Sequence, residues 1–411
     1  MFKLRLTVSS KDLFYGVSLF IIIGSVILRI ERFVVMNMLL AMVSMLIVII
    51  VTVKNLRTLK VLQPFLLIEI GIYLYIIINT LRFHYIDSLF PILMMFIKGI
   101  AVAAVFAAYK NNKVTVCKML CDVFLVLIIL NLIQMLFFPD LIGYNGGMRS
   151  YLISSNYNQF GGIFMPGILM SYITASIEKH NAWRFVLITL LSIISVAIVG
   201  SVTSTLCFLL LAVFFLIRKK MILVKIATLG LIMFIVMFFY TFVVSSYDSV
   251  LNNSTLVDNF MDYTGKSMTF SGRTNVWFKS LFIISSHPVL GIGAYAGGSY
   301  ANHYLGVSNV HNVFLELFML GGAVLFCVVS ISVILLFYQL HKKIDKVYFY
   351  GELFIFMVFI LMMQLEVYNY FMIFLFFLSL YFSSGISTIR KKHENINNIK
   401  RIPICSRSSV R

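Results

Sequence analysis

Long apolar runs alternate with short polar segments along most of the chain. A membrane-crossing helix needs roughly 20 apolar residues, and the runs accommodate about twelve such helices. Two runs are too long for one helix, so they are divided at Gly200-Ser201 and at residues 364–369. The resulting spans are 13–29, 33–53, 61–80, 89–109, 119–138, 161–177, 185–200, 201–217, 222–244, 310–338, 349–364 and 369–385. The pattern predicts an all-α polytopic integral membrane protein, with one transmembrane domain (1–385) and a basic tail (386–411).

Two polar segments lie between predicted spans, residues 139–160 and residues 245–309, and the longer one cannot be buried in lipid. The longer one separates the predicted ninth and tenth spans. With the residues up to 312 it holds three of the seven histidines and a cluster of glycines. Because charged residues make up only 12% of the chain, polar chemistry has few other places to occur. If the protein catalyses a reaction, the chemistry is therefore expected in residues 245–312.

Lysine and arginine are distributed unequally between the two sides of the predicted membrane domain. With the N-terminus inside, most of the 33 basic residues fall in the inner loops and the tail. An excess of basic residues marks cytoplasmic loops, so both termini are predicted to be cytoplasmic and the two polar segments to face outward. The net charge of +18 reflects this topology and does not indicate nucleic acid binding.

Two ionisable residues fall near the middle of predicted spans, Glu69 in the third and Lys98 in the fourth. An unpaired charge in the bilayer costs several kcal/mol. Because a short loop joins these two spans, an ion pair between Glu69 and Lys98 is predicted. A proton relay is the alternative function of such a pair.

A helical pattern within residues 272–286 predicts an amphipathic helix on the outer membrane surface. Its apolar positions share one face: Val276, Trp277, Leu281 and Ile284. Arg273 would lie in the first turn. There it either binds an anion, since a helix N-terminus and a guanidinium both favour phosphate, or touches lipid headgroups.

His311 is the strongest single candidate for a catalytic residue. Ser308 or Asn309 can cap the tenth span, which would place His311 and Asn312 in its first turn. The helix dipole there disfavours an imidazolium, so a neutral imidazole could act as a base. The alternative is a histidine that is only hydrogen-bonded at the start of a helix.

The glycine-rich stretch 291–298 lacks the spacing of a dinucleotide-binding motif. The backbone N–H groups of Gly291 and Gly293 could bind an anion, or the stretch could be an ordinary loop. His287 and His303 lie on either side, but their spacing matches no zinc motif. No metal site is predicted.

The shorter polar segment carries an arginine followed by amide side chains, Arg149, Asn156 and Asn158. One guanidinium with several amides and hydroxyls suits sugar and phosphate. The same residues would also suit any solvated turn.

Several of these motifs together resemble the signature of O-antigen polymerases and ligases. The motifs are Arg273-x3-Trp277, then His287-Pro288-Val289-Leu290-Gly291-Ile292-Gly293, then His311-Asn312 at the start of a span. The predicted topology also matches this family: about twelve spans of roughly 20 residues each, with a large outer loop between the ninth and tenth.

Two further segments resemble elements of the same family, each with a departure. Asn156-Tyr157-Asn158 resembles its Asn-Pro-Asn element, with Tyr157 in place of proline. The segment 200–204 resembles an element that often carries arginine after the serine, where this chain has Val202. The role of that arginine therefore cannot be carried over.

The resemblance implies a multi-pass glycosyltransferase of the cytoplasmic (inner) membrane. Its donor would be a glycan linked to undecaprenyl pyrophosphate, and it would join repeat units of O-antigen, capsule or exopolysaccharide. Arg149 and Arg273 would bind the pyrophosphate, and His311 would activate the acceptor hydroxyl. The residues implied to contact substrate are Asn156, Asn158, Trp277, Gly291, Gly293, His303 and Asn312. No metal or other cofactor is implied, because two guanidiniums can supply the countercharge.

Two other functions are alternatives to the polymerase. A ligase would transfer the finished glycan to a lipid or another acceptor. A flippase or transporter could also have about twelve spans of roughly 20 residues, but it would not need clustered His, Arg and Gly. Donor and acceptor glycans, the lipid bilayer and a chain-length regulator are the expected partners.

Overall fold

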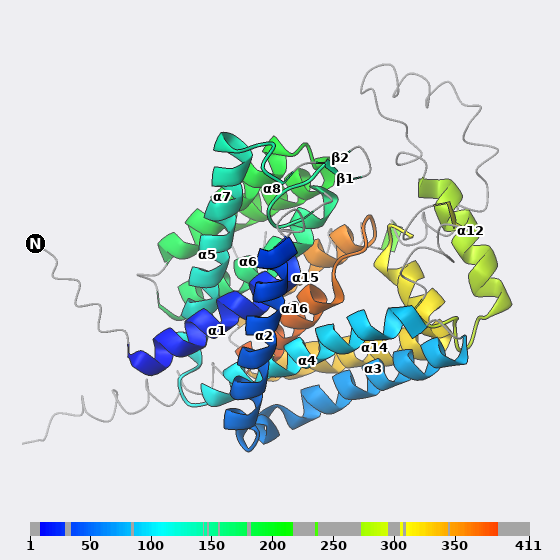
Figure 1. Ribbon diagram of the computed structural model, residues 1–411, viewed down its shortest axis with the longest axis horizontal. Helices are drawn as coiled ribbons and strands as arrows, with labels where there is room; N and C mark the ends of the chain where they lie inside the picture. The colour runs from blue at the N-terminus through cyan, green and yellow to red at the C-terminus, as the bar shows by residue number, and fades with distance from the viewer. Residues whose placement is uncertain are drawn as a thin grey trace, which may run out of the picture.

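The computed structural model describes residues 9–28, 34–83, 86–142, 144–145, 148–154, 157–178, 182–216, 235–236, 273–294, 305–306, 310–343 and 346–384. Within these ranges the fold is helical, apart from one short antiparallel strand pair (Figure 1). Among the described residues, 7 helices are long and apolar enough to cross a membrane, and four further apolar helices are shorter. The prediction of an all-α polytopic membrane protein is confirmed at this level.

The N-terminal elements are α1 (Ser10–Ile27), α2 (Val34–Asn55), η1 (Thr58–Leu62), α3 (Gln63–Arg82), η2 (Ile86–Ser88), α4 (Leu89–Ala108), α5 (Lys113–Phe137), β1 (Tyr144–Asn145), β2 (Met148–Arg149) and η3 (Tyr157–Gln159). The remaining elements are α6 (Phe160–Ile177), α7 (Ala182–Ile198), α8 (Val202–Leu216), α12 (Arg273–Ser286), α14 (Val313–Lys343), α15 (Lys346–Met363) and α16 (Tyr370–Ser383). All but one of the predicted spans coincide with a helix.

Most of the predicted span 222–244, most of the outer segment 245–309 and the whole tail 386–411 lie outside the described residues. Both predicted divisions of the long apolar runs are confirmed. Gly200, between α7 and α8, has a φ of +73°, a conformation that glycine adopts without steric cost. α15 ends at Met363, and the linker 364–369 leads to α16, whose first turn is capped by the side chain of Asn369.

The centre of the helical core is α6, the most buried of the long apolar helices in the part of the chain that the structure describes. It contacts α5, α7, α15 and α16. A close approach near its start depends on Gly162, where a Cβ atom would come within 2.2 Å of the Tyr368 ring. This glycine lets the α15–α16 linker, which contains Tyr368, pack directly against α6.

α14 is interrupted at Gly322, which has φ +60° and ψ −159°. The segment 288–293 fills the interruption through backbone hydrogen bonds to both sides of it. They join Ile292 N to Met319 O, Gly293 N to Leu320 O, Ala323 N to Pro288 O and Val324 N to Val289 O. Backbone groups left unpaired by a helix break are costly in a membrane. The segment therefore stabilises the break and is itself held against α14.

The predicted ion pair between Glu69 and Lys98 is wrong. Lys98 is buried in α4, and its Nζ donates to the carbonyl oxygen of Ser25 in α1 at 3.4 Å. Glu69 lies on α3 and lines a cavity on the side of α14. Whether the two side chains meet depends on how each helix is rotated about its own axis, and the hydropathy of a sequence does not show that rotation.

Candidate functional site

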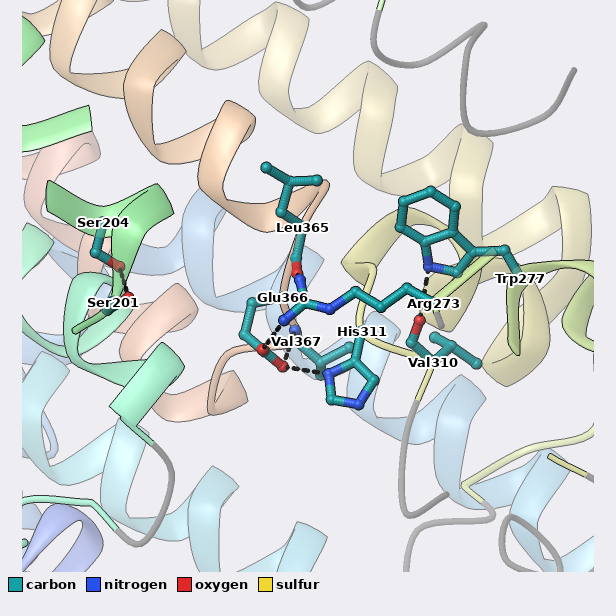
Figure 2. A network of polar contacts seen from close by, with 9 residues as sticks. All are labelled: Ser201, Ser204, Arg273, Trp277, Val310, His311, Leu365, Glu366 and Val367. Carbon is teal, nitrogen blue, oxygen red and sulfur yellow. Dashed lines mark hydrogen bonds and ion pairs between the residues drawn. The ribbon is translucent and has the colours of Figure 1, made fainter. Parts of the chain in front are cut away.

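Three segments that are far apart in the sequence meet at one polar cluster (Figure 2). Arg273 is the first residue of α12, His311 lies two residues before α14, and Glu366 lies in the α15–α16 linker. Arg273 Nη2 is 3.3 Å from Glu366 Oε2, and His311 Nδ1 is 3.0 Å from Glu366 Oε1. The arginine also donates from Nη1 to the carbonyl oxygen of Leu365. The structure thus brings together the predicted pair Arg273 and His311 through a third residue.

Glu366 is the centre of this cluster. Its side chain is 3% exposed, against 17% for Arg273 and 22% for His311. Each carboxylate oxygen faces a different partner, and Oε1 also accepts from the backbone N–H of Val367 at 3.1 Å. A buried carboxylate is stabilised when a guanidinium and N–H donors surround it. Glu366 is consequently held in one orientation between the arginine and the histidine.

The sequence pattern at residues 364–366 indicates a break between two spans and does not identify Glu366 as a site residue. A signal for it was present. An acidic residue within a long apolar run is costly in a bilayer, and such residues commonly mark functional sites. Its partners, however, lie 93 and 55 positions away in the chain, so no local pattern could identify them.

The contact with Glu366 orients the imidazole of His311. An ionised carboxylate can only accept hydrogen bonds, so the ring nitrogen facing it, Nδ1, carries a proton. In the neutral ring Nε2 is then the acceptor nitrogen. An imidazole with this tautomer, backed by a carboxylate, is the arrangement that suits a general base.

The predicted capping of α14 by Ser308 or Asn309 is wrong, and both residues lie outside the described ranges. The helix begins at Val313, and Asn312 is its cap. Its Oδ1 accepts from the backbone N–H of Phe314 at 2.9 Å and of Leu315 at 3.2 Å. The side chain of Asn312 thus caps α14 through its Oδ1, and its contact with substrate stays a prediction.

His311 therefore precedes the helix and does not lie in its first turn. Its φ is +51°, the one positive value among the described non-glycine residues. This left-handed conformation is uncommon for a residue with a side chain, and such conformations cluster at active sites. The unusual backbone supports a functional role for His311.

Trp277 supports the polar cluster from the interior of the protein. Its side chain is fully buried, and Nε1 donates to the carbonyl oxygen of Val310 at 3.0 Å. This bond ties α12 to the residue before His311. The bond gives Trp277 a structural role, and its contact with substrate stays a prediction.

The predicted helix at 272–286 is confirmed as α12, but its apolar face packs on protein. Val276, Trp277 and Ile283 form a buried cluster with Leu315 and Met319 of α14. The opposite side of α12 exposes Phe278 and Phe282. Burial against α14 fixes where Arg273 lies relative to His311.

The remaining predicted site residues lie in different surroundings. The N–H of Gly291 donates to His287 O at 3.1 Å and that of Gly293 to Leu320 O at 3.0 Å, so the expectation that these amides face an anion is wrong. Asn158 lies in η3 and is partly exposed. Arg149 lies in β2, and its side chain is outside the described part of the structure. Asn156 and His303 lie wholly outside the described residues.

A second group of polar side chains borders the linker on the side of α8 (Figure 2). Ser201 and Ser204 are both buried, and the hydroxyl of Ser201 donates to that of Ser204 at 3.0 Å. Between α8 and the start of α6, a Cβ atom on Gly161 would come within 2.6 Å of the Ser204 Oγ. The residues that follow Asn158 thus pack near the linker that carries Glu366.

Among the described residues, no group of three His, Cys, Asp or Glu side chains forms a metal site.

Comparison with known families gives a match over the middle of the chain. Residues 185–330 match the family described as O-antigen ligase. The resemblance to the family of O-antigen polymerases and ligases is therefore confirmed. No curated protein matches the chain.

The matched residues include Arg273 and His311 but end before Glu366. They cover most of α7, all of α8 and α12, and the part of α14 before residue 331. The linker that follows α15 therefore completes the polar cluster from outside the matched residues.

Proposed function

We propose that this protein is a polymerase that joins undecaprenyl-pyrophosphate-linked repeat units of O-antigen, capsule or exopolysaccharide. The observation that carries the proposal is the contact of one buried carboxylate, Glu366, with both Arg273 and His311. The cluster combines an oriented imidazole with a fixed cation. That combination suits the transfer of a sugar from a phosphate leaving group to a hydroxyl.

In the proposed step, His311 Nε2 takes the proton of the acceptor hydroxyl while its oxygen attacks the anomeric carbon of the donor sugar. The bond between that carbon and the pyrophosphate oxygen breaks, and the pyrophosphate leaves on its lipid with the electron pair. Glu366 stabilises the imidazolium that forms at His311. The imidazolium later returns its proton to solvent.

Arg273 supplies positive charge to the leaving group. A guanidinium has five N–H donors, so those not directed at Leu365 and Glu366 can donate to phosphate oxygens. Arg149, in the segment 139–160, is proposed as the second cation. The scheme uses no metal ion.

The proposed orientation places both termini in the cytoplasm and the cluster on the outer face of the cytoplasmic membrane. It rests on the concentration of basic residues in the inner loops and in the tail 386–411. No inner loop is long enough for a nucleotide-sugar domain, so an activated donor would arrive in the lipid. A chain-length regulator is proposed as a protein partner.

The description of the matched family favours a second candidate function, ligation of a finished glycan to a lipid or other acceptor. The same cluster would serve this reaction, because the bond that breaks is the same and only the acceptor hydroxyl differs. A flippase breaks no bond and therefore needs no general base for an acceptor hydroxyl.

A glycan length profile separates these functions. We expect a strain without the protein to carry surface glycan capped with one repeat unit, and the wild-type protein to restore the ladder. His311→Ala should not restore it at equal protein level, whereas His287→Ala, at a histidine outside the cluster, should. Long chains stranded on the carrier in the deletion strain would identify a ligase instead. Single repeats trapped on the inner face would identify a flippase.

A further inference from the structure

Two buried amide side chains of α5 bind the backbone of the segment that follows β2. Asn131 is fully buried, and Gln134 is 3% exposed. Asn131 Oδ1 accepts from the backbone N–H of Ile153 at 3.3 Å, and Gln134 Oε1 accepts from that of Leu152 at 3.2 Å. The two amides are three residues apart on the helix, so they share one face of it. That face meets two consecutive N–H groups of the segment.

The two N–H groups lie at the tip of a tight turn. The N–H of Tyr151 donates to the carbonyl oxygen of Ser154 at 2.9 Å, and the N–H of Ser154 donates to that of Tyr151 at 3.3 Å. Ile153, between them, is 1% exposed. A buried N–H without an acceptor is costly, and more so beside lipid. The two amides of α5 therefore fix the position of this turn.

The turn is joined on both sides to residues of the proposed site. Arg149 is the last residue of β2 and comes two positions before Tyr151. On the other side, the Ser154 hydroxyl donates to the side-chain oxygen of Gln159 at 3.4 Å. Gln159 directly follows Asn158 in η3. A shift of the turn would consequently move both Arg149 and Asn158.

The same turn packs against the start of α6, which leads to the polar cluster. The ring of Tyr151 meets that of Phe160 edge-on, with centroids 5.4 Å apart. Two residues further along α6, a Cβ atom on Gly162 would come within 2.2 Å of the Tyr368 ring. Tyr368 lies two residues after Glu366 in the linker. Close packing thus continues from α5 through the turn and α6 to the linker that carries Glu366.

We propose that Asn131 and Gln134 are positioning residues for the lipid-linked donor. By holding the turn, they place Arg149 where it binds the pyrophosphate beside Arg273. This inference rests on the proposed function for the role of Arg149. Neither amide touches the donor, because each acts through the backbone of the turn. Loss of either bond releases β2 and weakens donor binding, whereas the polar cluster is retained.

The test is a double-mutant cycle with Asn131 and Arg149 in the purified full-length protein. Asn131→Ala should raise the KM for the donor about tenfold, as expected for the loss of one hydrogen bond, and leave kcat largely unchanged. Hydrogen exchange at the Ile153 amide should become faster in the same variant. In an Arg149→Ala background, Asn131→Ala should raise the KM no further, because two residues that act as one unit are not additive.

Two further variants separate positioning from general stability. Asn131→Asp keeps an acceptor oxygen in the same place, so its KM for the donor should stay near that of the wild type. Asn55, on α2, is a buried amide whose Oδ1 accepts from the Tyr15 hydroxyl at 3.0 Å. Asn55→Ala should lower thermal stability and leave the KM for the donor unchanged.

Additive losses in the double variant, or an equal rise of KM in Asn55→Ala, would overturn the proposal. A normal KM in Arg149→Ala would contradict the proposed role of Arg149 and this inference with it. Binding of undecaprenyl pyrophosphate is measured in parallel, because it needs no sugar transfer, and unchanged binding in Asn131→Ala would also overturn the proposal. Weakened binding in a protein that transfers no sugar would contradict the polymerase and the ligase while supporting the positioning role.

Discussion

Two buried carboxylates lie near opposite ends of α15, and their surroundings differ. Glu352, near the first turns, is 4% exposed and accepts a hydrogen bond from the Ser383 hydroxyl at 2.9 Å. Glu366, just beyond the other end, is 3% exposed but faces Arg273 and His311. The same chemical group therefore has a neutral partner in one place and a cation with an imidazole in the other.

The difference separates a structural acid from one that can take part in a reaction. A hydroxyl partner ties α15 to α16 and needs no change of charge at Glu352. Glu366 instead contacts a guanidinium and an imidazole. The charge around it can therefore change when the imidazole gains a proton or when a phosphate binds the guanidinium. Burial by itself thus does not indicate function, whereas the partners of a buried acid do.

The largest effect is expected from Glu366→Gln. The amide keeps the size of the side chain but no longer stabilises an imidazolium at His311, so transfer should fall by roughly 10²–10⁴-fold, the usual contribution of general base catalysis. The measurement is transfer between lipid-linked repeat units by purified protein in lipid nanodiscs, with thermal stability recorded in parallel. Glu352→Gln serves as the control and should keep activity within about threefold, as expected for the loss of one hydrogen bond. Equal losses in the two variants would remove the distinction between the carboxylates.

A smaller loss is expected from Arg273→Lys. Lysine keeps the positive charge but lacks the planar fork that can hold Glu366 and a phosphate together. Transfer should fall by about tenfold, the equivalent of roughly one charge-assisted hydrogen bond, and Arg273→Ala should fall further. The control is Arg184→Lys, because Arg184 pairs with Asp122 at 3.1 Å, away from the cluster. Undiminished donor binding in Arg273→Ala would contradict the role in pyrophosphate binding.

The smallest effect is expected from Tyr370→Phe. Tyr370 begins α16, and its bond to Glu316 of α14, which is 2% exposed, joins the helix after His311 to the helix after Glu366. Loss of this bond should lower kcat about fivefold, as expected from the typical strength of one hydrogen bond, and should also change the pH profile of the rate.

The matched control is Tyr75→Phe, which removes a hydroxyl bonded to Gly321 O at 3.0 Å. This bond joins α3 to α14 away from His311. An unchanged pH profile in Tyr370→Phe would limit the Glu316 contact to general packing.

Local sequence determined most of the helical elements. Apolar runs of membrane-spanning length predict α1 to α8 and α14 to α16, because a helix satisfies its own backbone inside lipid. The break at Gly200-Ser201, the linker after Met363 and the amphipathic pattern of α12 are also local features. The motifs around Arg273 and His311 could be recognised for the same reason.

Tertiary structure alone decided which residues meet. Glu366 joins the cluster only because α15 and α16 place their linker beside α12 and α14. The segment that contains Gly291 and Gly293 fills the break in α14. The side chain of Lys98 contacts α1 and not Glu69. Hydropathy records how deep a residue lies in the membrane. It does not record the rotation of a helix or the identity of its neighbours, which depend on side-chain packing across the whole bundle.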